Sequence, residues 1–249
     1  MHASLSGRDL VGVLNPGARP VHLSTAEERG KVPPLDRFFV DLGLDGERVR
    51  AAVRVGDMVT LRQPFADLGD VVTGKALDDR SGCWILQRTL ERIATPAFDV
   101  HAVFTVQEEV GLRGATTGAF AVAPDLAVAL DTTLALDTPG NEADTHVTEL
   151  GAGVAVKVMD NHTISTRWLV DAFVALADRR GVPYQLEVLP LGGTDAAAMQ
   201  RSRSGAPSIT LSTPSRYVHT VTEMVAKADL EAAVALLSAA IEEGVGAPA

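Results

Sequence analysis

Two pairs of adjacent carboxylates are the first candidates for catalytic groups in this sequence. Asp78 and Asp79 lie at a predicted strand-to-helix turn, where one side chain could cap the helix while the other binds a cation. Glu108 and Glu109 directly follow an apolar segment, where a solvated surface glutamate is less expected than within a helix. A bend at the end of that segment would let one glutamate bind a metal ion and the other act as a general base.

Two further segments carry side chains that could complete such a site. Asp131 ends a predicted buried strand, although it could equally begin the turn that follows. His219 could ligate a metal ion or serve as a structural hydrogen-bonding residue. The neighbouring Arg216 and Tyr217 could bind a carboxylate or carbonyl group of a substrate. These groups stand at the ends of predicted strands, where α/β enzymes place their sites.

Weaker signals come from a glycine turn and from the single cysteine. The turn at residues 192–195 contains Gly193 and Thr194, which are candidate substrate-binding residues, and Asp195, which could simply cap the following helix. Cys83 lies on a predicted buried helix face without a paired histidine, so we expect a structural role. The sequence has no His-Glu-x-x-His, Gly-x-Ser-x-Gly or Walker-type motif.

The elements that position these side chains fall into two predicted domains. Residues 1–74 are expected to form a small β-rich module, with strands at 10–14, 38–40 and 58–61 and a short helix within 24–31. From residue 75 onward, apolar strands alternate with helical patterns, which predicts an α/β layered domain with a mostly buried sheet over residues 75–249. Its strands are predicted at 100–106, 127–130, 154–159, 186–189 and 208–211, and its helices at 79–92, 166–180, 196–200 and 229–243.

Composition excludes several classes of partner and location. The chain has 249 residues with 22 Lys+Arg against 32 Asp+Glu, and this net charge of −10 argues against a nucleic-acid partner. No apolar run reaches the ~18 residues that cross a bilayer, so we expect no membrane partner. A single cysteine forms no internal disulfide, and the N-terminus does not read as a signal peptide. We therefore expect a cytoplasmic protein.

Taken in order, the segments resemble the M42 family of metallo-aminopeptidases over nearly the whole chain. The matching segments are Lys-Ala-Leu-Asp-Asp-Arg-Ser-Gly, Gln-Glu-Glu-Val-Gly-Leu-Arg-Gly-Ala, Ala-Leu-Asp-Thr, Gly-Gly-Thr-Asp and Arg-Tyr-Val-His. The resemblance implies removal of N-terminal residues from peptide substrates. It also implies a catalytic domain like that of the zinc exopeptidases, with a mixed β-sheet flanked by helices and a PDZ-like β module. Homo-oligomers, from dimers to a hollow dodecamer, are implied as well.

The resemblance also implies a site with two divalent metal ions, zinc or cobalt, that share a water molecule. By motif, Asp78 resembles the carboxylate that bridges the metals, Glu109 and His219 the ligands of one metal, and Asp131 a ligand of the other. Glu108 resembles the general base that takes a proton from the shared water.

Two features of the family pattern bear on how well this chain could do that chemistry. Asp79 follows the bridging position and would help to set the turn there. The family's second histidine ligand belongs to a His-x-Asp segment, and no His-x-Asp occurs in this sequence. The second metal would then have only two carboxylate ligands, Asp78 and Asp131, which are too few to hold it tightly.

We therefore expect the chain to bind one metal better than two and to have little or no peptidase activity alone. A fragment or misplaced start, a partner chain that supplies the missing ligand, and an inactive remnant of the family are the open explanations. Hydrolysis of acyl-amino groups or sugars on the same scaffold is a further alternative.

Overall fold

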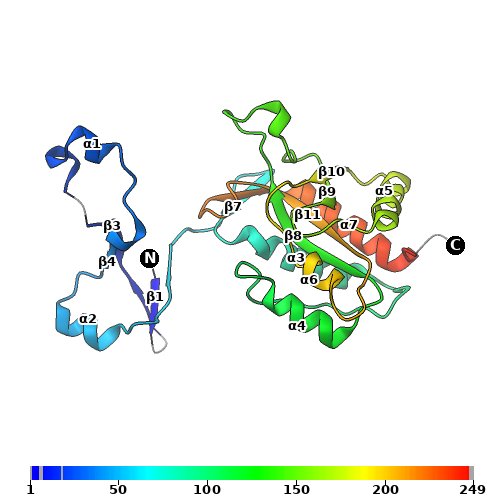
Figure 1. Cartoon of the computed structure of the whole chain (residues 1–249), viewed down its shortest axis with the longest axis horizontal. Helices are drawn as coiled ribbons and strands as arrows, with labels where there is room; N and C mark the ends of the chain where they lie inside the picture. The colour runs from blue at the N-terminus through cyan, green and yellow to red at the C-terminus, as the bar shows by residue number, and fades with distance from the viewer. Residues whose placement is uncertain (1, 6–7, 18, 247–249) are drawn as a thin grey trace. The chain divides into compact units, whose positions relative to one another are not determined.

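The computed structural model describes residues 2–5, 8–17 and 19–246 of the chain (Figure 1). The chain divides into two compact units, Met1–Gln63 and Pro64–Ala249. We expected the division after residue 74. It falls earlier because β7 (Val71–Gly74) pairs with β12 (Glu223–Ala226) and with β6 (Ala66–Asp67), so this segment belongs to the sheet of the larger unit.

The first unit contains two small antiparallel sheets and short helices. One sheet has the order β2-β1-β5, and the other pairs β3 with β4. The strands are β1 (His2–Leu5), β2 (Arg8–Val11), β3 (Val13–Pro16), β4 (Phe38–Asp41) and β5 (Val59–Thr60). The helices are α1 (Ala26–Arg29) and α2 (Gly46–Ala52), with 3-10 turns η1 (Val21–Leu23) and η2 (Leu35–Arg37).

A capping box starts helix α1. The Oγ1 atom of Thr25 accepts a hydrogen bond from the backbone N–H of Glu28 at 3.1 Å, and the backbone N–H of Thr25 donates to Oε2 of Glu28 at 2.8 Å. Two of the helix's unpaired N-terminal donors are thereby satisfied. The helix ends before the cap residue Gly30, within the range of residues 24–31 that we expected.

The second unit is built on a seven-stranded mixed sheet with the order β10-β9-β11-β12-β7-β6, in which β8 also pairs with β11. β8 runs parallel to β11 and β9 parallel to β10, whereas β9 and β12 are antiparallel to β11. The remaining strands are β8 (Ala127–Leu134), β9 (Val154–Met159), β10 (Tyr184–Val188) and β11 (Ser208–Arg216). This arrangement confirms the predicted mixed α/β fold.

Helices cover both faces of this sheet (Figure 1). The apolar core lies on the face with α3 (Leu77–Arg92), α5 (Arg167–Arg180) and α7 (Lys227–Glu243), where Ile209 and Leu211 of β11 are buried. On the other face, Thr210 of β11 contacts Thr194 in the turn before α6 (Ala196–Gln200), and α4 (Arg113–Val122) packs against α6. This alternation along β11 is what a strand between two layers of helices requires. No helix among the described residues is long and apolar enough to span a membrane.

Two predictions from the apolar pattern were wrong. Residues 100–106 form no strand, because no other described strand pairs with this segment, and Val103, Phe104 and Val106 remain exposed. Cys83 is exposed, not buried. The buried face of helix α3 carries Ile85 and the polar Thr89 instead.

Candidate metal centre

Three predicted ligands converge at the C-terminal side of the sheet of the second unit. The Nε2 atom of His219 lies 3.2 Å from Oδ2 of Asp78 and 3.4 Å from Oε2 of Glu109. One ligand atom from each of the three residues therefore lies within 4.8 Å of the other two. Carboxylate oxygens and an imidazole nitrogen are donors that suit zinc and related divalent metals. The donor set fits a metal ion bound between the three side chains.

A second group of possible ligands shares Asp78 with the first. Asp78, Asp79 and Asp131 each offer an oxygen within the same 4.8 Å limit. We predicted Asp78 and Asp131 in this place, but the structure adds Asp79. The group consists of carboxylates alone, a donor set that favours harder cations than zinc. The two groups therefore differ in the metal that they would hold tightly.

The two aspartates of the strand-to-helix turn have different contacts: Asp79 caps helix α3, and Asp78 faces His219. Their backbone angles are not helical, and the peptide bond between Asp78 and Asp79 is cis. The Oδ1 atom of Asp79 accepts a hydrogen bond from the backbone N–H of Gly82 at 2.9 Å, which caps the regular part of α3. A Cβ atom on Gly82 would lie 2.3 Å from Oδ2 of Asp79, so only glycine leaves room for this cap. Asp78 is left free to face His219.

Glu108 stands beside the ligands in an environment that favours its protonated form. Burial, followed by the charges of Asp195, Glu109 and Asp78, raises the pKa of Glu108 to about 7. A carboxyl group with a pKa near neutrality can accept and return a proton at physiological pH. This pKa suits the general-base role that the family resemblance implies for Glu108, which stays a prediction.

Uncompensated negative charge surrounds this position. Burial, with the charges of Asp78 and Asp195 as further causes, raises the pKa of Asp79 to about 8. Burial also raises the pKa of Asp78, with the charge of Glu109 next in importance, and it raises the pKa of Asp131 well above its usual value. Carboxyl groups that repel one another in this way are stabilised as anions when a cation lies between them.

This electrostatic strain predicts that the metal-free chain loses stability as pH rises. Unfolded Asp and Glu ionise near 3.8 and 4.5, whereas in the folded chain the pKa is about 8 for Asp79 and about 7 for Glu108. Between these values the folded state binds more protons, so the free energy of unfolding falls with increasing pH. In the presence of a chelator, the Tm at pH 8 should be several degrees below that at pH 5.5. Glu108→Gln should reduce this difference, and a Tm that rises over the same interval would contradict the prediction.

The predicted substrate-binding residues have partners within the protein. Arg216 donates from Nε and Nη2 to the two carboxylate oxygens of Asp137, at 2.6 and 2.8 Å, so Asp137 already engages its guanidinium group. Tyr217 has a positive φ of 59° and remains half exposed, so its side chain is accessible to a ligand. Their role in substrate binding stays a prediction, and at Arg216 a substrate would have to compete with Asp137.

Residues of the glycine turn before α6 also contact other parts of the protein. The Oγ1 atom of Thr194 lies 2.8 Å from that of Thr210, and both residues are buried. A Cβ atom on Gly193 would lie 2.5 Å from Nδ1 of His162, so this position requires glycine for packing. We therefore find a structural task for Gly193 and Thr194, and their predicted contact with substrate stays a prediction.

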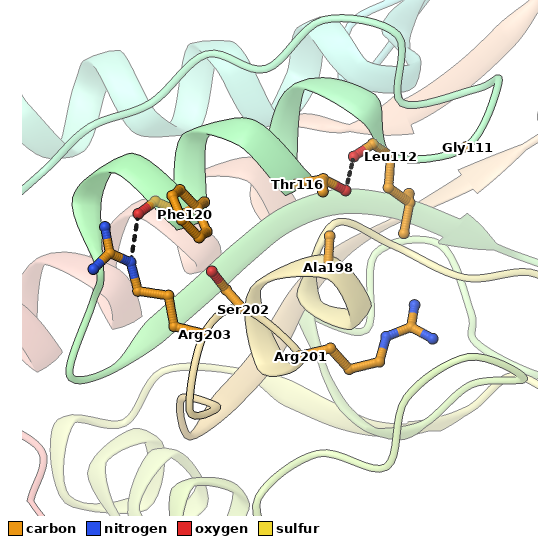
Figure 2. A pocket seen from close by; sticks show the side chains of 8 residues that line it. All are labelled: Gly111, Leu112, Thr116, Phe120, Ala198, Arg201, Ser202 and Arg203. Carbon is orange, nitrogen blue, oxygen red and sulfur yellow. Dashed lines mark hydrogen bonds between the residues drawn. The ribbon is translucent and has the colours of Figure 1, made fainter.

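A pocket of about 350 Å³ lies between α4 and α6 (Figure 2). The Nε atom of Arg203 donates to the backbone oxygen of Phe120 at 2.7 Å, and its guanidinium group stacks 4.5 Å from the Phe120 ring. None of the proposed metal ligands lines this pocket.

Two acidic residues near the centre make contacts that the sequence did not predict, and the cap expected from Asp195 is not formed. Asp195 makes no side-chain cap to α6, and its Oδ2 atom instead accepts a hydrogen bond from Oγ1 of Thr105 at 2.6 Å. This bond joins the α6 turn to the segment that leads to Glu108. Glu223 is buried and contacts the backbone of both Asp78 and His219. Only the folded chain reveals these links, because the residues are far apart in the sequence.

The chain matches a known protein family over most of its length. A family model described as M42 glutamyl aminopeptidase matches residues 4–236. The chain belongs to this family. Among M42 relatives, a putative aminopeptidase of Acetivibrio thermocellus is 38% identical over 83% of this chain. An aminopeptidase structure from the archaeon Desulfurococcus kamchatkensis is 37% identical and covers 98% of this chain with a TM-score of 0.92.

A third relative is described by its assembly. The TET1 peptidase of Pyrococcus horikoshii, which can form a tetrahedron or a large octahedral shell, is 31% identical over 97% of this chain with a TM-score of 0.81. This M42 chain covers 71% of that protein, 68% of the Desulfurococcus protein and 62% of the Acetivibrio protein. It thus spans about two thirds of the length of these relatives.

Proposed function

We propose that the site around Asp78 serves metal-dependent removal of N-terminal residues from peptides. The observation that carries this proposal is the meeting of Asp78, Glu109 and His219 within 4.8 Å in a chain of the M42 family. Asp78, Glu109 and His219 would hold one divalent metal, zinc or cobalt. Asp78 and Asp131, with Asp79 nearby, would hold a second.

Glu108 would act as the general base of this reaction. When bound, the metal ions would lower the pKa of a coordinated water and polarise the scissile carbonyl group. Glu108 would accept a proton from the attacking water and return it to the amine that leaves. Its pKa of about 7 suits both directions of transfer. Asp79 would keep the turn in place through its cap on Gly82.

A second candidate function is metal binding with little or no peptidase activity. The composition of the two ligand groups favours it, because only the first contains an imidazole and the second consists of carboxylates alone. A chain of this kind would hold one zinc ion tightly and would depend on a partner for turnover.

Hydrolysis and metal content together distinguish the two candidates. The chain should be stripped with a chelator, titrated with zinc or cobalt, and assayed with aminoacyl-4-nitroanilides. Release of 4-nitroaniline that requires the metal supports the aminopeptidase. One tight metal per chain without turnover supports the second candidate, and no metal binding at all would contradict both.

We further propose that copies of this chain associate, by analogy with the shells described for the Pyrococcus TET1 peptidase. The Met1–Gln63 unit, which we take to be PDZ-like, would supply contacts between copies. Light scattering on the purified chain tests this proposal, and a monomer at micromolar concentration would contradict it.

A further inference from the structure

A single buried carboxylate links the two segments that carry Asp78 and His219. The Oε2 atom of Glu223 accepts a hydrogen bond from the backbone N–H of Asp78 at 3.0 Å, and its Oε1 atom accepts one from the backbone N–H of His219, also at 3.0 Å. Only 3% of Glu223 is exposed. Each oxygen of this side chain therefore binds a residue that presents a ligand to the first metal position.

The sheet holds Glu223 itself in place. Glu223 begins β12 and pairs with Gly74, the last residue of β7, while Met224 pairs with Arg216 of β11. β7 leads directly into the turn that contains Asp78, and β11 leads into the segment that contains His219. Glu223 thus lies between the two strands from which the ligands emerge, where its carboxylate can set the distance between them.

The backbone at His219 needs such support. His219 has a φ of 63°, in the left-handed region that residues other than glycine rarely adopt. Its side chain is 68% exposed, so packing contributes little to its position. The hydrogen bond to Glu223 is therefore a contact that can stabilise this conformation and direct the imidazole toward Asp78.

We infer that Glu223 is a positioning residue for the metal centre, which brings the Asp78 carboxylate and the His219 imidazole together through their backbones. The inference rests on the proposed function, because it assigns a purpose to the geometry of the ligands. It requires a carboxylate at this place: two N–H groups converge on it, and a glutamine would offer one oxygen and one NH₂ group that faces a donor. Glu223→Gln therefore keeps the size of the side chain and removes one of the two bonds.

The chain offers a matched control at Asp229. This residue of α7 is fully buried, and its two oxygens accept hydrogen bonds from the backbone N–H groups of Gly151 and Gly153 at 2.7 and 2.8 Å. Asp229→Asn makes the same chemical change away from the proposed ligands. We expect both variants to lose stability, but only Glu223→Gln to lose zinc affinity, by the ~10–100-fold that follows loss of a ligand's supporting hydrogen bond.

Zinc affinity should be measured by competition with a chromophoric chelator, at a temperature where circular dichroism shows both variants folded. If Glu223→Gln binds zinc within about threefold of the unaltered chain, the inference is wrong. If Asp78→Asn also leaves zinc binding unchanged, the proposed site itself fails, so the two failures can be told apart.

A second measurement keeps the inference testable if Glu223→Gln does not fold. Hydrogen exchange in the unaltered metal-free chain should be slow at the amides of Asp78 and His219, although the His219 side chain is exposed. Exchange of both amides at the rate of an unprotected peptide would contradict the inference.

Discussion

Asp78→Asn should lower the affinity of the chain for zinc by at least ~100-fold, more than the loss of an outer hydrogen bond to a ligand produces. Asp78 belongs to both groups of possible ligands, and its Oδ2 atom lies 3.2 Å from the imidazole of His219. An amide keeps the shape of the side chain but removes the negative charge that a divalent ion requires. Isothermal titration with zinc measures the effect directly.

The matched control for this variant is Asp125→Asn. Asp125 is an exposed carboxylate that precedes β8, whereas Asp131 lies within that strand. The same substitution there should leave zinc affinity unchanged. Equal losses in the two variants would show that net charge alone, not a defined site, governs metal binding.

Glu108→Gln should reduce metal-dependent turnover by ~10²–10⁴-fold, the range expected for removal of a general base. Glu108 has a pKa of about 7 beside the ligands, and glutamine can neither accept nor return the proton. Zinc affinity should change by less than about threefold, because Glu108 belongs to neither ligand group among the described residues. The measurement pairs the rate of 4-nitroaniline release with metal content.

Glu109→Gln is the natural contrast to this variant. Its carboxylate lies 3.4 Å from His219 and belongs to the first ligand group, so its loss should weaken zinc binding as well as turnover. Turnover in Glu108→Gln equal to that of the unaltered chain would remove Glu108 from the mechanism. A loss of zinc affinity as large as that of Glu109→Gln would make Glu108 a ligand instead.

Side-chain type and local pattern singled out the carboxylates and the histidine that meet in the structure, but they left a helix cap open for Asp78 and a structural role open for His219. The resemblance to the M42 family was needed to assign Asp78, Glu109 and His219 as ligands. Strand β9 was predicted with its observed bounds, because its apolar residues follow Gly153 and end at the polar pair Asp160 and Asn161. The expectation that one aspartate of the pair caps the helix while the other faces a cation site agrees with the contacts of Asp79 and Asp78.

What the sequence could not predict depends on contacts between distant segments. Arg216 looked available for substrate until Asp137 was found beside it. Helix α4 was not predicted, because its residues include glycines and threonines, which have low helix propensity. The role of Glu223 was hidden because both of its partners are backbone groups, which carry no signal of residue type.

A crystal structure of the zinc-loaded chain, with anomalous scattering at the zinc edge, tests the central claim most directly. We expect a strong anomalous peak in contact with an oxygen of Asp78, an oxygen of Glu109 and a ring nitrogen of His219. A second and weaker peak is expected beside Asp131. Zinc bound elsewhere on the chain, with the imidazole of His219 turned away from Asp78, would contradict the assignment of this site.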